Sequence, residues 1–160
     1  MCIGASALTG SLKGGLGSAS LVFDNGATVA ALVATNPIGN VTTPNNRHFW
    51  AAPFEIDAEF GGVGTDPASG LGRDLSSRKL AAFQERANTT IAIVATDMVM
   101  DKAQCQRVAI ASHDGIGRAI VPAHMPGDGD AVFALSTGEI EMQNPDIDLM
   151  MIGHAAALCL

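Results

Sequence analysis

The residue pair Asn88-Thr89 is the first candidate for covalent chemistry in the sequence. Its threonine hydroxyl directly follows the backbone carbonyl of an asparagine. In a self-cleaving precursor, the Thr89 hydroxyl attacks the Asn88 carbonyl carbon and water hydrolyses the resulting ester. Thr89 then becomes an N-terminal residue whose own α-amino group serves as its base. Such an amine has a pKa of about 8, so much of it is neutral near physiological pH. The same residues also fit an ordinary strand start, and Asn88-Thr89-Thr90 fits the N-glycosylation pattern, so the pair alone does not decide.

Two acidic residues in a glycine turn are the next candidates. Asp128 and Asp130 are separated only by Gly129. Two carboxylates so placed can orient the Thr89 hydroxyl and hold a newly formed ammonium group, or a substrate's amino group. The same residues also suit a solvated Asp-Gly-Asp turn. Neither the cysteines nor the histidines have metal-ligand spacing, so the sequence predicts no metal site.

The elements that must position these residues can be predicted from the pattern of apolar residues. The β-branched, apolar run from Asn88 to Asp97 predicts a buried strand. A hairpin is expected from residues 19–23 and 27–34, joined by Asp24-Asn25-Gly26, and its second strand delivers Asn36 to its end. Further elements are expected downstream: a helix from Asp101 to about Ile120, a strand over residues 131–136, and an apolar helix over residues 147–160.

The segment from Pro44 to Ser77 is rich in Pro, Gly, Asn and Asp and predicts a long irregular loop. A short helix is plausible over residues 75–86, between this loop and Asn88. The glycine-rich stretch from Gly14 to Ser20 lacks the ending of a phosphate loop and is interpreted as a turn or as close backbone packing beside a site.

The composition is that of a folded domain. The chain has 160 residues, 48% hydrophobic and 16% charged, with a net charge of -7. This acidic balance argues against binding of nucleic acid, which needs clustered Lys and Arg. No run is long enough to span a bilayer and no leader precedes the first residues, so we expect no membrane contact and a cytoplasmic location.

Several blocks in order resemble the DmpA-type aminopeptidases, the L-aminopeptidase/D-esterase family (peptidase family S58/P1) of N-terminal-nucleophile hydrolases that includes β-aminopeptidases and a nylon-oligomer hydrolase. The resemblance extends over most of the chain. The blocks are Lys13 to Ser20, Ala31 to Gly39, and the run from Asn88 through His113-Asp114-Gly115, Arg118-Ala119-Ile120, Pro122 and His124 to Asp128-Gly129-Asp130 and Ala134.

The resemblance implies an α/β fold of the αββα four-layer type, here incomplete. It implies a self-cleaving aminopeptidase or amidase that acts through an acyl-enzyme on Thr89, with cleavage between Asn88 and Thr89 and no cofactor. Asn36 matches the family's oxyanion-stabilising asparagine, and the alternative interpretation is a strand-ending Asx turn. Lys13 matches a lysine that lines the site in some members, although a surface lysine is an equal interpretation. Asp128 and Asp130 match two acidic or hydroxyl positions.

The resemblance also predicts the organisation of the chain. Residues 1–160 are expected to form a single partial domain, with 1–88 similar to the end of the family's α-subunit and 89–160 to the start of its β-subunit. We expect small peptide or amide substrates and a homo-oligomer in the full-length form. The family's active-site tyrosine has no counterpart, because the chain contains no tyrosine. Two alternatives therefore stay open: an inactive or structural fragment, and an acyltransferase like the ornithine acetyltransferases, although the Lys-Gly block of the latter is not seen before Asn88.

Overall fold

The computed structural model describes residues 7–68, 73, 76–81 and 88–160. The chain divides into two compact units. The first contains residues 1–15, 35–90 and 117–130, and the second contains residues 16–34, 91–116 and 131–160. The sequence prediction of a single partial domain stays a prediction, and the two units are described separately below.

The second unit contains most of a four-stranded sheet in the order β1-β2-β3-β4, and the end of β2 and the start of β3 belong to the first unit. The strands are β1 (Gly15–Val22), β2 (Thr28–Asn36), β3 (Thr89–Met98) and β4 (Ala131–Ile140). β1 and β2 form the predicted hairpin, and β3 pairs in parallel with β4, with Ile91 opposite Ala131. The predicted strands are present, but β1 begins four residues before the predicted start at residue 19, so most of the glycine-rich stretch is strand and not a turn. β4 extends four residues beyond the predicted end at Ser136.

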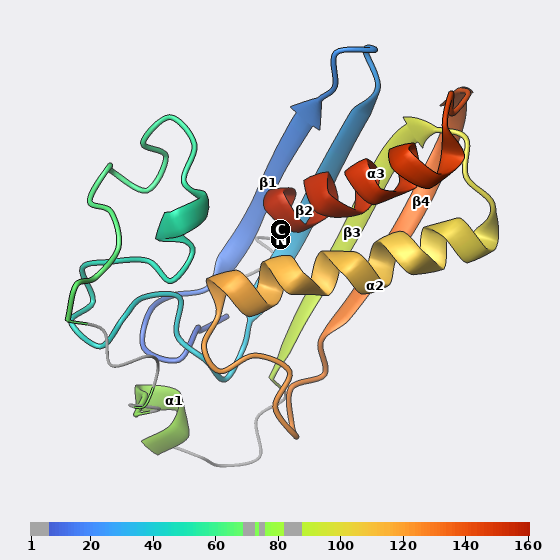
Figure 1. Ribbon diagram of the computed structural model, residues 1–160. Coiled ribbons are helices and arrows are strands. Elements are labelled where there is room, and N and C mark those ends of the chain that lie inside the picture. The colour runs from blue at the N-terminus through green and yellow to red at the C-terminus, as the bar shows by residue number, and fades with distance from the viewer. Residues whose placement is uncertain (1–6, 69–72, 74–75, 82–87) are drawn as a thin grey trace. The chain divides into compact units, whose positions relative to one another are not determined.

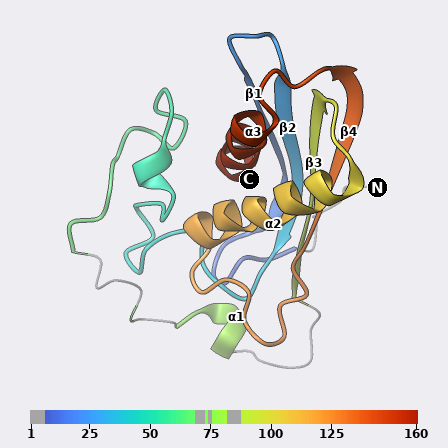
Figure 2. The same cartoon turned by 45° about the vertical axis from the view of Figure 1, so that its right-hand side comes forward.

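Two helices cover one face of this sheet (Figures 1 and 2). They are α2 (Lys102–Ala119) and α3 (Pro145–Cys159). α2 begins with a reciprocal cap, because the Asp101 carboxylate accepts from the Gln104 N–H and the Gln104 side chain accepts from the Asp101 N–H, both at 2.8 Å. Because alternate strand residues point to one face, the core combines Val29, Val94 and Met98 from the sheet with Val108 and Ile152 from the helices.

The opposite face of the sheet carries exposed apolar side chains. They alternate along the strands with the core residues, as the two-residue period of a strand requires. They are Leu16, Leu32, Ile91, Ile93, Phe133 and Leu135. Within the described residues, the second unit therefore consists of one sheet and one helical layer.

The first unit is mostly irregular, as the composition of residues 44–77 predicts. Its described helices are the short η1 (Ala52–Phe54) and α1 (Arg78–Ala81). Side chains order the loop: the Glu55 carboxylate accepts from the Phe60 and Gly62 N–H groups at 2.7 and 2.9 Å. The predicted short helix is present over Arg78–Ala81, and residues 82–87 lie outside the described part of the chain.

Candidate functional site

The carbonyl oxygen of Asn88 receives two hydrogen bonds at the start of β3. The Thr89 hydroxyl donates to it over 2.5 Å, and the Gly129 backbone N–H donates to it over 2.8 Å. Asn88 is 7% exposed and forms a parallel bridge with Asp128. The hydroxyl thus lies against the carbonyl group that self-cleavage would require it to attack. The Gly129 N–H is already placed to stabilise negative charge on that oxygen.

Gly129 leaves little room for a side chain. A Cβ atom built there would lie 3.0 Å from the Thr89 hydroxyl oxygen and 3.6 Å from the Asn88 carbonyl oxygen. The glycine between the two aspartates therefore lets the backbone approach the hydroxyl closely.

Asp128 connects this point to the end of β2. Its Oδ1 atom accepts from the Ile38 N–H at 3.0 Å, two residues after Asn36. Its Oδ2 atom is buried and has no hydrogen-bond partner among the described residues. Burial raises the pKa of the Asp128 carboxyl above its ordinary value, and the nearby charge of Asp130 adds to the increase. The Ile38 N–H and the Lys79 ammonium act in the opposite direction.

The Asp130 carboxylate binds a backbone N–H group at the start of β3. Its side chain is 3% exposed, and its Oδ1 atom accepts from the Thr90 N–H at 2.8 Å. Its Oδ2 atom lies 2.8 Å from the His124 Nδ1 atom. Both carboxylates of the Asp-Gly-Asp turn therefore take part in specific contacts beside Thr89. The solvated-turn interpretation does not describe them.

His124 is a residue that the sequence interpretation did not place in the site. It lies six residues before Asp130. No ligand-like spacing marks it in the sequence, and the only available signal was its inclusion in the block of family-like residues.

Asn36 stands at the end of β2, as predicted, and its side chain is held there. Its Oδ1 atom accepts from the Leu8 N–H at 3.1 Å and from the Lys79 Nζ atom at 3.0 Å. Gly14 permits the close approach of the neighbouring strand, since a Cβ at this position would lie only 2.3 Å from the Thr35 carbonyl oxygen. This agrees with the interpretation of the glycine-rich stretch as close packing.

The lysine that contacts the site is Lys79, which the sequence interpretation did not select. Lys13 lies in an isolated bridge with Leu8, and it is exposed. No hydrogen bond among the described residues joins Lys13 to Asn36, Asp128 or Thr89. The role of Lys13 in a site stays a prediction.

Some of the buried polar atoms without hydrogen-bond partners in the described chain belong to residues next to, or bridged to, the Asn88-Thr89 bond. Within the described chain they include the Asn88 Oδ1, Thr90 Oγ1 and Asp128 Oδ2 atoms. Such atoms are costly to bury unless they are hydrogen-bonded, which suits a place where a water or a reacting group is received. No three described His, Cys, Asp or Glu residues gather as a metal site would require.

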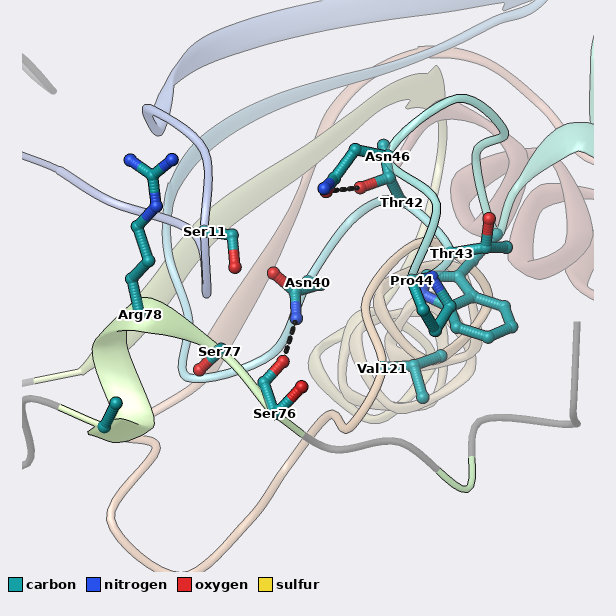
Figure 3. Close-up of a pocket in the computed structure, with 12 residues that line it drawn as sticks. Ser11, Asn40, Thr42, Thr43, Pro44, Asn46, Ser76, Ser77, Arg78 and Val121 are labelled. Atoms are coloured by element: carbon teal, nitrogen blue, oxygen red, sulfur yellow. Dashed lines mark hydrogen bonds between the residues drawn. The ribbon is translucent and has the colours of Figure 1, made fainter.

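A separate polar pocket of about 340 Å³ lies in the first unit (Figure 3). None of the site residues above lines it. At one wall the Asn40 amide donates to the Ser76 carbonyl oxygen at 3.3 Å, and Thr42 contacts Asn46 at 3.2 Å. The lining consists of hydroxyl and amide side chains with Arg78, Trp50 and a few apolar residues, without the nucleophile-and-acid arrangement of the Thr89 region.

Comparison with known proteins identifies the family. The model of peptidase family S58 matches residues 2–159. This chain belongs to peptidase family S58. An uncharacterized aminopeptidase of Mycobacterium tuberculosis is 41% identical over 170 aligned positions, which cover 99% of this chain and 48% of the relative. A 6-aminohexanoate-oligomer endohydrolase of Paenarthrobacter ureafaciens is 28% identical over 71% of this chain and 31% of the relative.

Among solved structures, the S58 chain is similar to the L-aminopeptidase D-Ala-esterase/amidase of Ochrobactrum anthropi. The match has a TM-score of 0.63 and 25% identity, and it covers 98% of this chain and 40% of that one. That structure is described as a variant of the N-terminal-nucleophile hydrolase fold. The predicted family and the α/β fold, present in part, are therefore confirmed. The S58 chain spans about half the length of the curated relatives it matches, at 48%.

No described helix is long and apolar enough to cross a membrane.

Proposed function

We propose that this S58 chain cleaves itself between Asn88 and Thr89. In this proposal, the released Thr89 is the nucleophile of an aminopeptidase or amidase that acts on small peptides, amides or esters. The single observation that carries the proposal is the Asn88 carbonyl oxygen. It receives the Thr89 hydroxyl at 2.5 Å and the Gly129 N–H at 2.8 Å.

The self-cleavage proceeds in two steps. The Thr89 oxygen attacks the Asn88 carbonyl carbon, and the Gly129 N–H stabilises the negative charge that develops on the carbonyl oxygen. The carbon–nitrogen bond then breaks, the hydroxyl proton passes to the leaving nitrogen, and an ester joins the two pieces. Water hydrolyses this ester, leaving a carboxylate on Asn88 and a free amine on Thr89.

The same residues act again on a substrate. The Thr89 amine takes the proton of its own hydroxyl, and the oxygen attacks the substrate carbonyl to form an acyl-enzyme that water hydrolyses. Asp128 and Asp130 hold the charged form of the new amine, or the amino group of the substrate. The side-chain N–H of Asn36 stabilises the oxyanion. Base and nucleophile belong to one residue, so the reaction requires no cofactor.

Intact mass measurement under denaturing conditions tests the first reaction. We expect the purified wild-type chain to give two pieces that divide between Asn88 and Thr89, and the Thr89→Ala chain to remain whole. Thr89→Ser, which keeps a hydroxyl, is the matched control and should still cleave. A wild-type sample that contains only the uncleaved chain would contradict the proposal.

The second reaction is tested with amino-acid p-nitroanilides. Cleaved wild-type protein should release p-nitroaniline, and Thr89→Ala should not. Cleavage without turnover of any amide or ester substrate would support self-processing but contradict the aminopeptidase part of the proposal.

A further inference from the structure

The ammonium group of Lys79 lies in a cage of oxygen atoms at the end of β2. Its Nζ atom donates to the carbonyl oxygens of Leu8, Asn36 and Pro37, each at 2.8 Å, and to the Asn36 side-chain oxygen at 3.0 Å. An ammonium carries only three protons, so the four acceptors must share them. The positive charge of the ammonium offsets the repulsion between the partial negative charges of the four converging oxygens.

The backbone around Lys79 is tied to the same unit, so the position of the ammonium does not depend on the four-residue helix alone. The Lys79 N–H donates to the Gly10 carbonyl oxygen at 2.9 Å. The Leu80 N–H is capped by the Ser77 hydroxyl at 3.0 Å. Just before the helix, the Ser76 carbonyl oxygen accepts from the Asn40 amide, as the dashed line in Figure 3 shows.

This cage fixes the orientation of the Asn36 amide. Among the described residues, the Asn36 Oδ1 atom accepts from the Lys79 ammonium and from the Leu8 N–H, and both groups can only donate. The oxygen must therefore occupy this branch of the amide, and the NH₂ group must occupy the other. A reversed amide would bring two donors against two donors and lose both hydrogen bonds.

We propose that Lys79 is a positioning residue that orients the Asn36 amide, so that the NH₂ group and not the oxygen is on the side of the proposed oxyanion. The inference rests on the proposed function, in which Asn36 stabilises the oxyanion during substrate hydrolysis. Lys79 does not touch the reacting atoms in this role. It acts through the Asn36 side chain, and its loss allows the amide to turn and present an oxygen to the developing negative charge.

The test compares Lys79→Ala with Asn36→Ala, the double variant, and Lys102→Ala as a control at an exposed lysine outside the site. Turnover of a p-nitroanilide is measured on fully cleaved protein. Removing an oxyanion donor lowers kcat by about 100- to 1000-fold, so we expect Asn36→Ala in that range and Lys79→Ala about tenfold or more below wild type. KM should change little, since the interaction forms in the transition state.

Two further results distinguish positioning from general damage. The double variant should be no slower than Asn36→Ala, because Lys79 acts only through Asn36. Added ethylammonium, which resembles the missing end of the side chain, should restore part of the kcat of Lys79→Ala and should not affect Asn36→Ala. If Lys79→Ala does not fold, Lys79→Met, which keeps the apolar stem, replaces it.

A wild-type kcat in the folded Lys79 variant, or losses that add in the double variant, would overturn the inference while leaving self-cleavage and hydrolysis by the wild-type protein intact. A wild-type protein that neither cleaves nor hydrolyses overturns the proposed function and this inference together.

Discussion

Replacing Gly129 with alanine tests whether close packing at the Asn88-Thr89 step controls the self-cleavage reaction. The added Cβ would lie 3.0 Å from the Thr89 hydroxyl oxygen, where the neighbour must give by a few tenths of an ångström. The backbone N–H of residue 129 remains, so the stabilising donor is retained while the nucleophile is displaced. A misplacement of about 1 Å can cost about 100-fold in rate, so a smaller displacement should slow cleavage by about tenfold.

The assay follows the uncleaved chain by denaturing mass spectrometry after rapid purification, or during refolding from urea. Gly117→Ala is the matched control, because a Cβ at Gly117 meets nothing within 4 Å and alanine favours a helix. Gly117→Ala should cleave at the wild-type rate. The reasoning is refuted if Gly129→Ala cleaves as fast as wild type, or if both alanine variants are slowed equally.

Three further predictions concern stability, each measured by urea unfolding of the uncleaved Thr89→Ala chain. Burial raises the pKa of Asp128 in the folded state. The free energy of unfolding of the chain with Asp128 should therefore fall relative to that of Asp128→Asn as the pH rises above about 4, and the two free energies should converge at lower pH. A difference that does not depend on pH would contradict this. Ile152→Ala, at a fully buried position with 0% exposure, should lower the free energy of unfolding by about 2–5 kcal/mol, and a loss as small as that at an exposed site would contradict the assigned core. Asp101→Ala should cost about 1 kcal/mol by removing the reciprocal cap of α2, and an unchanged midpoint would show that the cap does not contribute.

The regular elements could be predicted because their signals are local. The turn residues before Ala27 predict a hairpin, and the apolar run after Thr89 predicts β3. The run predicts a buried strand, and it does not reveal that Ile91 and Ile93 lie on the exposed face. The three-residue spacing of Asp101 and Gln104 is typical of a helix cap and predicts the start of α2. The start of α3 was placed two residues late, since Pro145 begins the helix and Asn144 caps it.

The site was only partly predictable because its contacts join distant parts of the chain. Asp128 reaches the Ile38 N–H across 90 residues, and Lys79 reaches Asn36 across 43. No periodicity encodes such contacts. Family resemblance pointed to Asn36, the two aspartates and Lys13. It did not point to Lys79, because most of the acceptors around Lys79 are backbone carbonyls, which any sequence supplies. The Gly129 N–H was missed for the same reason.

The position of the Asn88-Thr89 bond within the sheet has a consequence for how the protein would fold and persist. β1 and β2 precede this bond and β3 and β4 follow it, yet all four strands belong to one sheet in the order β1-β2-β3-β4. Cutting the bond turns a unimolecular unfolding reaction into the dissociation of two polypeptides, whose re-encounter depends on concentration. The unfolded state then gains the freedom of two separate chains, which is the reverse of the effect of a covalent cross-link. If the chain cleaves itself as proposed, we expect the sheet to form before the cut, and the persistence of the cut protein to depend on its rate of unfolding.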